Sequence, residues 1–410
     1  MEKSVRLPIR AGGPPNWLLI GLLAVLVRLL FAVIIGRFWH IETWEYETIA
    51  DHLLQGHGFI YGHLHTLYRS YCEPLYPFLV AGIYALTHHS HWVLLVVQSV
   101  LYGITAVLAG RCAELATGNS RVALLAGLLV ALDPALILYA TKQHPLVLDA
   151  LFMTLVALSS LLYAQKPTSL RAAGIGLSVG LCTLTRPTIV AVIPLLIWWI
   201  GKKQIGRILL MLGVSLLVVS PWILRNYKVQ GRWMLTRSNT PFVFWLGNNP
   251  NATGSALDAG GEDLLKRAPP EFLEKIYRSD ERTQNRLFGE AAWAYVRSDP
   301  WGFVRRAGQK WLYFWWFSPQ AGLSYPSGWL RLYRVWWGML LLAGGWGALR
   351  LRTFSPPARH SMLFLLGTAL IVSGVQSLFY VEGRHRLAIE PIVTGLVAFG
   401  LYDMMKRLCR

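Results

Sequence analysis

Charged residues are scarce in this 410-residue chain, and acidic residues are the scarcest of them. Only 15% of the residues carry a charge, with 21 Asp and Glu against 39 Lys and Arg, whereas 54% are hydrophobic. A water-soluble protein of this length needs a more polar surface. Apolar runs of the length that a helix needs to cross a bilayer recur along the chain. The composition therefore predicts an all-α polytopic membrane protein.

Cysteines are also few, and their spacing excludes a zinc motif or a disulfide framework. The four cysteines, Cys72, Cys112, Cys182 and Cys409, lie far apart in the sequence, whereas metal-binding cysteines come in close pairs. The formal net charge is +18, but no motif that binds RNA or DNA accompanies it. In a membrane protein, such an excess fills cytoplasmic loops and contacts anionic headgroups. We expect membrane lipids as partners and no nucleic acid.

Ten apolar segments are expected to span the membrane. They are residues 16–36, 92–112, 121–140, 145–164, 171–185, 187–200, 206–224, 328–349, 360–380 and 388–405. The basic segments beside them are Lys3/Arg6/Arg10, Arg111/Arg121, Lys166/Arg171, Lys202/Lys203/Arg207, Arg350/Arg352/Arg359 and Lys406/Arg407/Arg410. With ten spans, all these basic segments lie on one side, which the positive-inside rule identifies as the cytoplasm. Both termini are then cytoplasmic.

The polar remainder of the chain is expected on the external side. Residues 42–55 are amphipathic at helical spacing, and EPLYPFLVAGIYAL (73–86) is short for a span, so both are expected to lie in the interface. We predict that the chain has three parts. Residues 1–225 form a transmembrane core with a first external loop at 37–91. Residues 226–326 form a long external loop with short helices near 282–298 and 300–317, and 327–410 form the C-terminal transmembrane helices.

The stretch IETWEYETIADHLLQGHGF (41–59) concentrates acids directly after the first span, beginning with Glu42. A carboxylate near hydrocarbon has its charged form disfavoured, which raises its pKa and makes it a better general base. These acids could equally form the polar face of a surface helix and nothing more. Spacing alone leaves both interpretations open.

Basic and polar residues at the external ends of the spans form a second pattern. They are Lys142 and His144 in TKQHP, Arg186 in TRP, Arg225 and Asn226 in PWILRN, and Glu382, Arg384, His385 and Arg386 in EGRHR. Each could by itself be a snorkelling side chain. However, the positive-inside rule predicts few Arg on this side. Because Arg binds phosphate bidentately and stays charged, the set suggests a reaction with a phosphate leaving group.

In their order along the chain, these segments resemble the GT-C superfamily of glycosyltransferases, in the group of protein O-mannosyltransferases and lipid A aminoarabinose transferases. Glu42, Tyr46, Ile49 and Ala50 match the acid, the Tyr and the Ile/Leu-Ala of that family's first external loop. EPLYPFL resembles its PPLYP segment. LLQGHGF, LTRP, PWILRNY, WLGNNPNATG and RHRLAIEP resemble further segments, so the match covers nearly the whole chain.

The resemblance implies a GT-C-like bundle and an inverting glycosyltransferase at the external, periplasmic face of the bacterial inner membrane. A sugar would move from a polyprenyl-phosphate carrier to a hydroxyl of an acceptor lipid, glycan or protein. The family's general base maps onto Glu42. The expected substrate-binding residues are Glu45, Tyr46, Glu73, Lys142, His144, Arg186, Arg225, Asn226, Arg384 and Arg386. No cofactor is implied and no metal ligand is assigned, although metal use varies in the superfamily.

Two departures from the family pattern leave the site open. The family's acid is usually Asp, often followed by Glu, whereas this chain has Glu42-Thr43, so Glu45 could be the base, with Glu73 the next candidate. His144 stands where relatives have an acid before Pro, which puts a second acidic role in doubt.

Two other functions fit the same spans. A flippase or transporter of lipid-linked sugar usually has internal repeats and mid-membrane charges. Here no repeat is found, and the ionisable groups other than Arg28 and Asp149 gather at one surface. A glycan ligase or polymerase that uses polyprenyl-diphosphate oligosaccharide would differ in donor and acceptor rather than in architecture.

Overall fold

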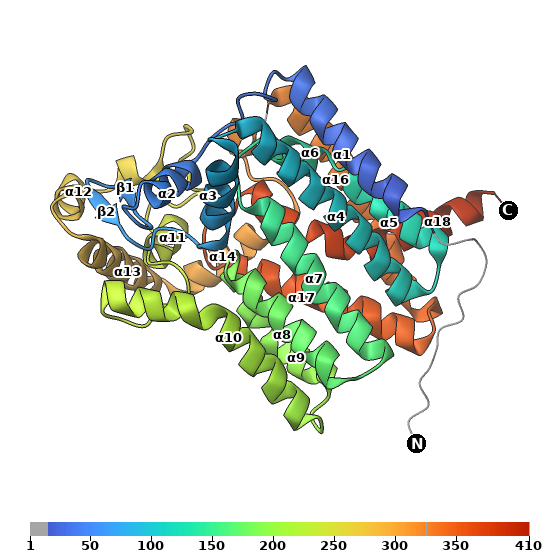
Figure 1. The fold of residues 1–410 in the computed structure, drawn as a ribbon. Coiled ribbons are helices and arrows are strands. Elements are labelled where there is room, and N and C mark those ends of the chain that lie inside the picture. The colour runs from blue at the N-terminus through green and yellow to red at the C-terminus, as the bar shows by residue number, and fades with distance from the viewer. Residues whose placement is uncertain (1–14, 325, 410) are drawn as a thin grey trace.

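The structure is a computed structural model that describes residues 15–324 and 326–409, and nearly all of it is helical (Figure 1). Each segment expected to span the membrane is helical. The helices are α1 (Trp17–Ile34), α4 (His91–Thr117), α5 (Ser120–Ala131) with α6 (Pro134–Tyr139), α7 (Leu146–Gln165), α8 (Ser169–Thr183), α9 (Ile193–Ile200), α10 (Ile205–Gln230), α16 (Ser327–Leu349), α17 (Pro356–Gln376) and α18 (Glu390–Leu408). In the described part of the chain, α1, α4, α7, α10 and α17 are long and apolar enough to cross a membrane. The predicted all-α polytopic fold is confirmed.

One expected span, residues 121–140, is two helices rather than one. Pro134 lacks a backbone N–H, and it begins α6 directly after a break at Asp133. The Asp133 carboxylate caps the new helix, accepting hydrogen bonds from the backbone N–H groups of Ala135 and Leu136, both at 2.9 Å. The proline therefore restarts the helix inside the apolar run.

Short elements gather at one end of the helical bundle, which we call the loop end; it lies at the left of Figure 1. They are α2 (Glu45–Leu54), β1 (Tyr61–His63), β2 (Thr66–Tyr68), α3 (Leu75–Thr87), α11 (Thr240–Gly247), η2 (Leu264–Arg267), α12 (Pro270–Tyr277), α13 (Glu281–Ser298), α14 (Pro300–Trp315) and α15 (Ala321–Ser324). The two interfacial helices correspond to α2 and α3, and the two expected loop helices to α13 and α14. The β1–β2 hairpin, which pairs Tyr61 with Tyr68, was not predicted.

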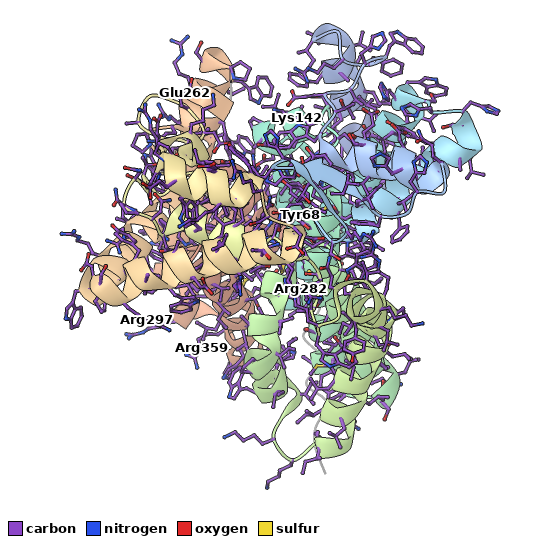
Figure 2. All side chains as sticks on the ribbon, turned by 90° about the vertical axis from the view of Figure 1, so that its left-hand side faces the viewer. Tyr68, Lys142, Glu262, Arg282, Arg297 and Arg359 are labelled. Carbon is purple, nitrogen blue, oxygen red and sulfur yellow. The ribbon has the colours of Figure 1, made fainter. Side chains whose placement is uncertain are left out.

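The loop end has a small apolar core of its own, in which Phe242, Trp245 and Phe288 are buried together. In Figure 2, which looks onto this end, Tyr68 lies near the centre and Lys142 above it. The Tyr68 hydroxyl donates a hydrogen bond to Gln284 on α13 at 2.7 Å. This bond ties the hairpin of the first loop to the long second loop.

The turns that join α7 to α8 and α9 to α10 carry basic residues and lie at the lower right of Figure 1, away from the loop end. This agrees with the one-sided basic pattern in the sequence. Lys3, Arg6, Arg10 and Arg410, together with the two chain ends, lie outside the described residues.

The C-terminal helices complete the same bundle, since α18 packs against α4, α5, α7 and α16. The remaining elements are the short helices η1 (Pro187–Val192), which leads into α9, η3 (Leu351–Thr353) and η4 (Gly383–Ala388).

Helices α16 and α18 approach so closely that a side chain does not fit between them. A Cβ atom on Gly400 would lie 1.9 Å from the Ala343 carbonyl oxygen. We expect Gly400→Ala to destabilise the protein by about 1–3 kcal/mol, because the two backbones must separate. Thermal melting in detergent measures this change. Gly345→Ala on α16 is the control, since no atom lies within 4 Å of its added Cβ. Equal melting temperatures for the two variants would contradict this packing.

Candidate active site

A polar cavity of about 190 Å³ lies where the loop end meets the bundle. Its walls come from the first loop, the start of α7, the turn before η1, the loop that leads into α11, and the segment between α17 and η4. Its acidic, basic and amide lining residues are Glu45, Glu73, His144, Asp149, Arg186, Arg237, Asn239, Gln376, Arg384 and His385. Segments far apart in the sequence thus supply one site.

Three arginines converge on this cavity, and each is oriented by a carboxylate. Arg186 pairs with Asp149 (Nη1–Oδ2, 3.0 Å), and both side chains are buried. Arg237 pairs with Glu73 (Nε–Oε1, 3.1 Å). Arg384 pairs with Glu382 (2.7 Å). Such pairing fixes planar guanidinium groups before a ligand arrives.

These arginines keep donors that the protein does not use. The buried Nε of Arg186 has no hydrogen-bond partner among the described residues. The Nε of Arg237 lies 3.1 Å from Glu73 Oε1 but is also buried without a hydrogen-bond partner among the described residues. Buried donors in native proteins are normally satisfied, so these groups indicate a ligand or water in the cavity. Phosphate, with its several acceptor oxygens, matches them.

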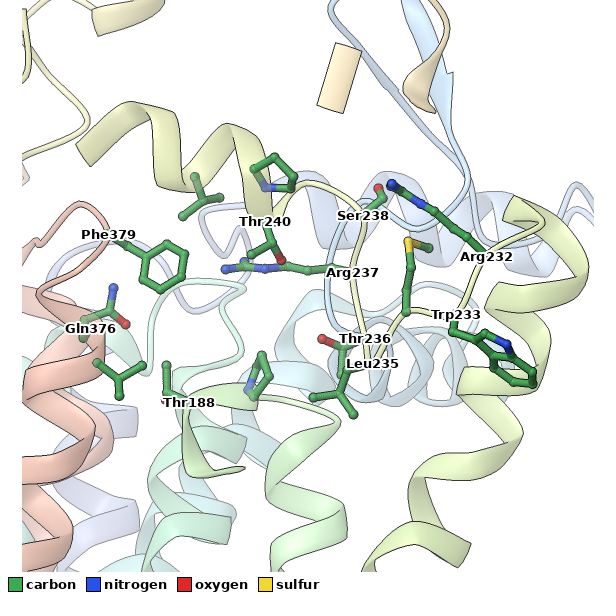
Figure 3. A pocket seen from close by; sticks show the side chains of 15 residues that line it. Thr188, Arg232, Trp233, Leu235, Thr236, Arg237, Ser238, Thr240, Gln376 and Phe379 are labelled. Atoms are coloured by element: carbon green, nitrogen blue, oxygen red, sulfur yellow. The ribbon is translucent and has the colours of Figure 1, made fainter. Parts of the chain in front are cut away.

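An apolar groove of about 430 Å³ continues from the polar cavity (Figure 3). The residues that line both are Pro187, Thr188, Arg237, Val243 and Gln376. In Figure 3, the Arg237 guanidinium extends toward Phe379, between the loop 232–241 and the end of α17. The cationic end of Arg237 therefore lies at the junction of a polar and an apolar space.

Glu42 and Glu45 lie in different surroundings on the two sides of Trp44. The Glu42 carboxylate accepts hydrogen bonds from Lys142 Nζ (3.0 Å) and Trp44 Nε1 (3.1 Å), and it also pairs with Arg37. Burial alone would raise the pKa of Glu42, but the hydrogen bond and charge of Lys142 lower it below its usual value. The raised pKa expected for Glu42 is therefore wrong, because Lys142 and Arg37 face it.

Glu45 lines the cavity itself and makes no ion pair within the described part of the chain. Burial raises the pKa of its carboxyl above the usual value, although the charge of Arg384 acts in the opposite direction. The raised carboxyl pKa that was expected for Glu42 thus belongs to Glu45, one residue after Trp44.

Tyr46 and His144 also line the cavity, and both are buried. Burial, together with the charge of Arg384, lowers the pKa of His144 well below its usual value, which favours the neutral imidazole. Lys142 lies beside the cavity rather than in its lining, held by Glu42. Of the expected substrate-binding residues, Glu45, Tyr46, Glu73, His144, Arg186 and Arg384 come together in the cavity lining.

Arg225, Asn226 and Arg386 lie outside this lining and contact the protein instead. Arg225 donates to Ser70 Oγ (2.9 Å) and to the carbonyls of Arg69 and Phe59. Asn226 donates to the Thr236 carbonyl at 2.8 Å. These contacts join the end of α10 to the first and second loops.

Arg386 is fully buried and lies behind the cavity wall. It pairs with Glu390 (Nε–Oε1, 2.7 Å) and donates to the Tyr333 hydroxyl (2.6 Å). It also donates to the carbonyls of Phe314 and Trp316 and faces the ring of Trp337 at 4.0 Å.

Several polar lining residues were not predicted from the sequence, namely Arg237, Asn239, Gln376 and Tyr380, and no role was predicted for Asp149. Asp149 had one usable signal, since a carboxylate in an apolar run needs a partner. Arg237 is an ordinary charge in a polar loop, and nothing local in TRSN marks it.

Comparisons with known proteins bear on the family. A family model described as dolichyl-phosphate-mannose-protein mannosyltransferase matches residues 72–224. That region contains Glu73, Lys142, His144, Asp149 and Arg186. A search of curated protein sequences gives no match.

Solved structures with the same architecture include two of the oligosaccharyltransferase of Archaeoglobus fulgidus. The apo form is 12% identical, covers 96% of this chain and 51% of its own, and has a TM-score of 0.54. AglB from this organism, in complex with an inhibitory peptide and a dolichol-phosphate, is 13% identical, covers 96% and 50%, and has a TM-score of 0.50. The chain thus spans about half the length of these proteins.

ArnT from Cupriavidus metallidurans bound to undecaprenyl phosphate is 15% identical and covers 94% of this chain and 77% of its own. Its TM-score of 0.45 is too low for a fold assignment. The family model and the two oligosaccharyltransferase structures confirm the resemblance to the GT-C superfamily, and the chain has the GT-C fold.

The contacts of Arg386 predict a role in stability. We expect Arg386→Ala to lower the free energy of unfolding by about 3–5 kcal/mol, because Glu390 would be left as a buried, unpaired charge. Thermal melting in detergent measures the loss. The double variant Arg386→Met/Glu390→Leu should recover much of it, since both charges are then removed. A single variant that melts like the parent protein would contradict this assignment.

Proposed function

We propose that this chain is an inverting glycosyltransferase that moves a sugar from a polyprenyl-phosphate carrier to a hydroxyl of an acceptor lipid, glycan or protein. The observation that carries the proposal is the arginine-lined polar cavity that opens directly into an apolar groove. A polyprenyl-phosphate sugar has the same succession of parts: an apolar tail, an anionic phosphate and a polar sugar.

The junction of the two spaces suits the carrier phosphate. The tail would lie in the groove between the loop 232–241 and the end of α17. The free donors of Arg237 and Arg186 would then bind the phosphate oxygens by charge-assisted hydrogen bonds. These donors would stabilise the charge that develops on the phosphate as its bond to the sugar breaks.

The acceptor side would lie at the opposite end of the cavity, near Trp44, Tyr46 and Glu45, none of which lines the groove. Inversion requires the acceptor oxygen to attack the anomeric carbon from the face opposite the phosphate. We assign the general base to Glu45, because it lines this end and its raised pKa suits proton abstraction. The hydroxyl proton passes to Glu45, the new carbon–oxygen bond forms, and the electrons of the broken bond pass to the phosphate.

Glu42 is the alternative base, because the resemblance assigns the family's acid to it. Its carboxylate is held by Lys142 and Trp44 just outside the cavity lining. To act as the base, it would have to leave Lys142 when substrate binds.

We expect Glu45→Gln to lower transfer by about 10²- to 10⁴-fold, the usual loss for a general base. Carrier binding should persist, because the base acts only when the acceptor is deprotonated. The measurement is release of polyprenyl phosphate from a radiolabelled carrier in detergent, with carrier binding measured in parallel. Purified protein that moves the carrier across a vesicle membrane without releasing polyprenyl phosphate would instead identify a transporter.

Glu42→Gln is the matched control, three residues earlier on the same segment, and should lose less activity than Glu45→Gln. If Glu42→Gln is inactive and Glu45→Gln is active, Glu42 is the base, as its alignment with the family's acid implies. If both stay active, the base is neither, and Glu73 in the cavity lining is tested next. Assays with monophosphate- and diphosphate-linked donors separate this transferase from a ligase or polymerase.

We also propose that the loop end faces the periplasm of the bacterial inner membrane and that the basic turns face the cytoplasm. In a Cys409→Ser background, whose other cysteines are buried, a membrane-impermeant thiol reagent should label Asn251→Cys in intact cells and spare Lys203→Cys. Both positions are exposed, so accessibility within the protein is matched. The reverse labelling pattern would place the site on the cytoplasmic side.

A further inference from the structure

A second cluster of ionisable side chains lies on the face of α2 that points away from the cavity. Glu47 follows Glu45 by two residues, which turns its side chain by about 200° around the helix. It is not among the residues that line the cavity. Facing it are His89 and His91, at the turn between α3 and α4.

The three side chains direct one potential ligand atom each toward a common point. Glu47 Oε1 lies 2.6 Å from His91 Nε2 and 3.3 Å from His89 Nε2. All three ligand atoms lie within 4.8 Å of one another. Zinc binds nitrogen and oxygen at about 2.0–2.2 Å, so tetrahedral ligand atoms lie on the order of 3.3 Å apart. Small rotations of these side chains would therefore admit the ion.

Residues that would hydrogen-bond to the metal ligands, here called the outer partners, are also in place. The other ring nitrogen of His89, Nδ1, lies 3.2 Å from the Asp51 carboxylate, one turn after Glu47 on α2. This contact occupies Nδ1 and leaves Nε2 of His89 free to bind a metal. The Tyr84 hydroxyl donates to Glu47 Oε1 at 2.8 Å and so orients the third ligand. Metal-binding histidines and carboxylates commonly have such second hydrogen bonds.

We propose that Glu47, His89 and His91 bind one divalent transition-metal ion, most suitably Zn²⁺, with a fourth position left to water. Two imidazoles and one carboxylate are a donor set that suits zinc, whereas magnesium and calcium prefer oxygen ligands alone. The ion would link α2 to the turn between α3 and α4. Without an ion, the pair between the exposed His89 and Glu47 contributes little to stability.

The experiment uses the full chain without an affinity tag, purified in detergent and stripped with a chelator. We expect one Zn²⁺ per chain by elemental mass spectrometry, and a visible absorption spectrum of tetrahedral nitrogen–oxygen ligation when Co²⁺ replaces Zn²⁺. Zn²⁺ should also raise the melting temperature. His89→Asn and His91→Ala should abolish the Co²⁺ spectrum and the thermal shift. Asp51→Asn should weaken Zn²⁺ binding about 10- to 100-fold, as for other outer partners of metal ligands.

His88→Asn is the matched control for His89→Asn. Both histidines are exposed and both have left-handed backbone, with φ of 51° and 64°, a conformation that Asn tolerates. Because His88 is outside the cluster, His88→Asn should bind Zn²⁺ like the parent chain. Failure of the parent chain to bind Zn²⁺, or unchanged binding in both His89→Asn and His91→Ala, would overturn the proposal. No arm of this test depends on sugar transfer.

Discussion

The buried ion pair between Arg186 and Asp149 is the contact on which the polar cavity depends. Asp149 lies in the first turn of α7, and Arg186 directly precedes η1. Arg186 also donates to Gln376 on α17 (3.3 Å) and to the His385 carbonyl in η4 (3.0 Å). One guanidinium thus contacts four segments of the chain. Neither charge is stable alone in this environment, so each segment must keep its place for the other to be satisfied.

The same requirement explains why the cavity contains carboxylates as well as arginines. Each cation at the site is matched by a protein acid, as Arg237 is by Glu73. The protein can therefore fold with the cavity empty of phosphate, while the remaining guanidinium donors stay available for it. Glu45 is the acid in this lining that has no such ion pair in the described structure, and burial raises the pKa of its carboxyl.

Helix α2 separates two kinds of chemistry by its periodicity. Glu45 faces the cavity, and Glu47 faces the histidines beyond it. A hydrogen-bond network also connects Glu47 to Glu42: the Tyr84 hydroxyl donates to Glu47 and accepts from Gln143 at 3.3 Å, and the Gln143 backbone N–H donates to the Glu42 carbonyl at 2.7 Å. A metal ion at the outer face of α2 would thus be connected through Tyr84 and Gln143 to Glu42, just before the helix.

The sequence by itself determined the helices, because hydropathy and helical spacing are local properties that a bilayer makes decisive. Glu73, His144 and Arg186, which the resemblance placed among the expected substrate-binding residues, lie in the cavity lining. Only the tertiary structure decided which charges meet. Arg384 and Arg386 are two residues apart, yet the turn of η4 places one in the cavity and buries the other against Glu390. The pKa of Glu42 is lowered rather than raised, because Lys142, a hundred positions away in the chain, lies 3.0 Å from its carboxylate. Coulombic and hydrogen-bonding energies depend on distances in space, which sequence separation does not reveal.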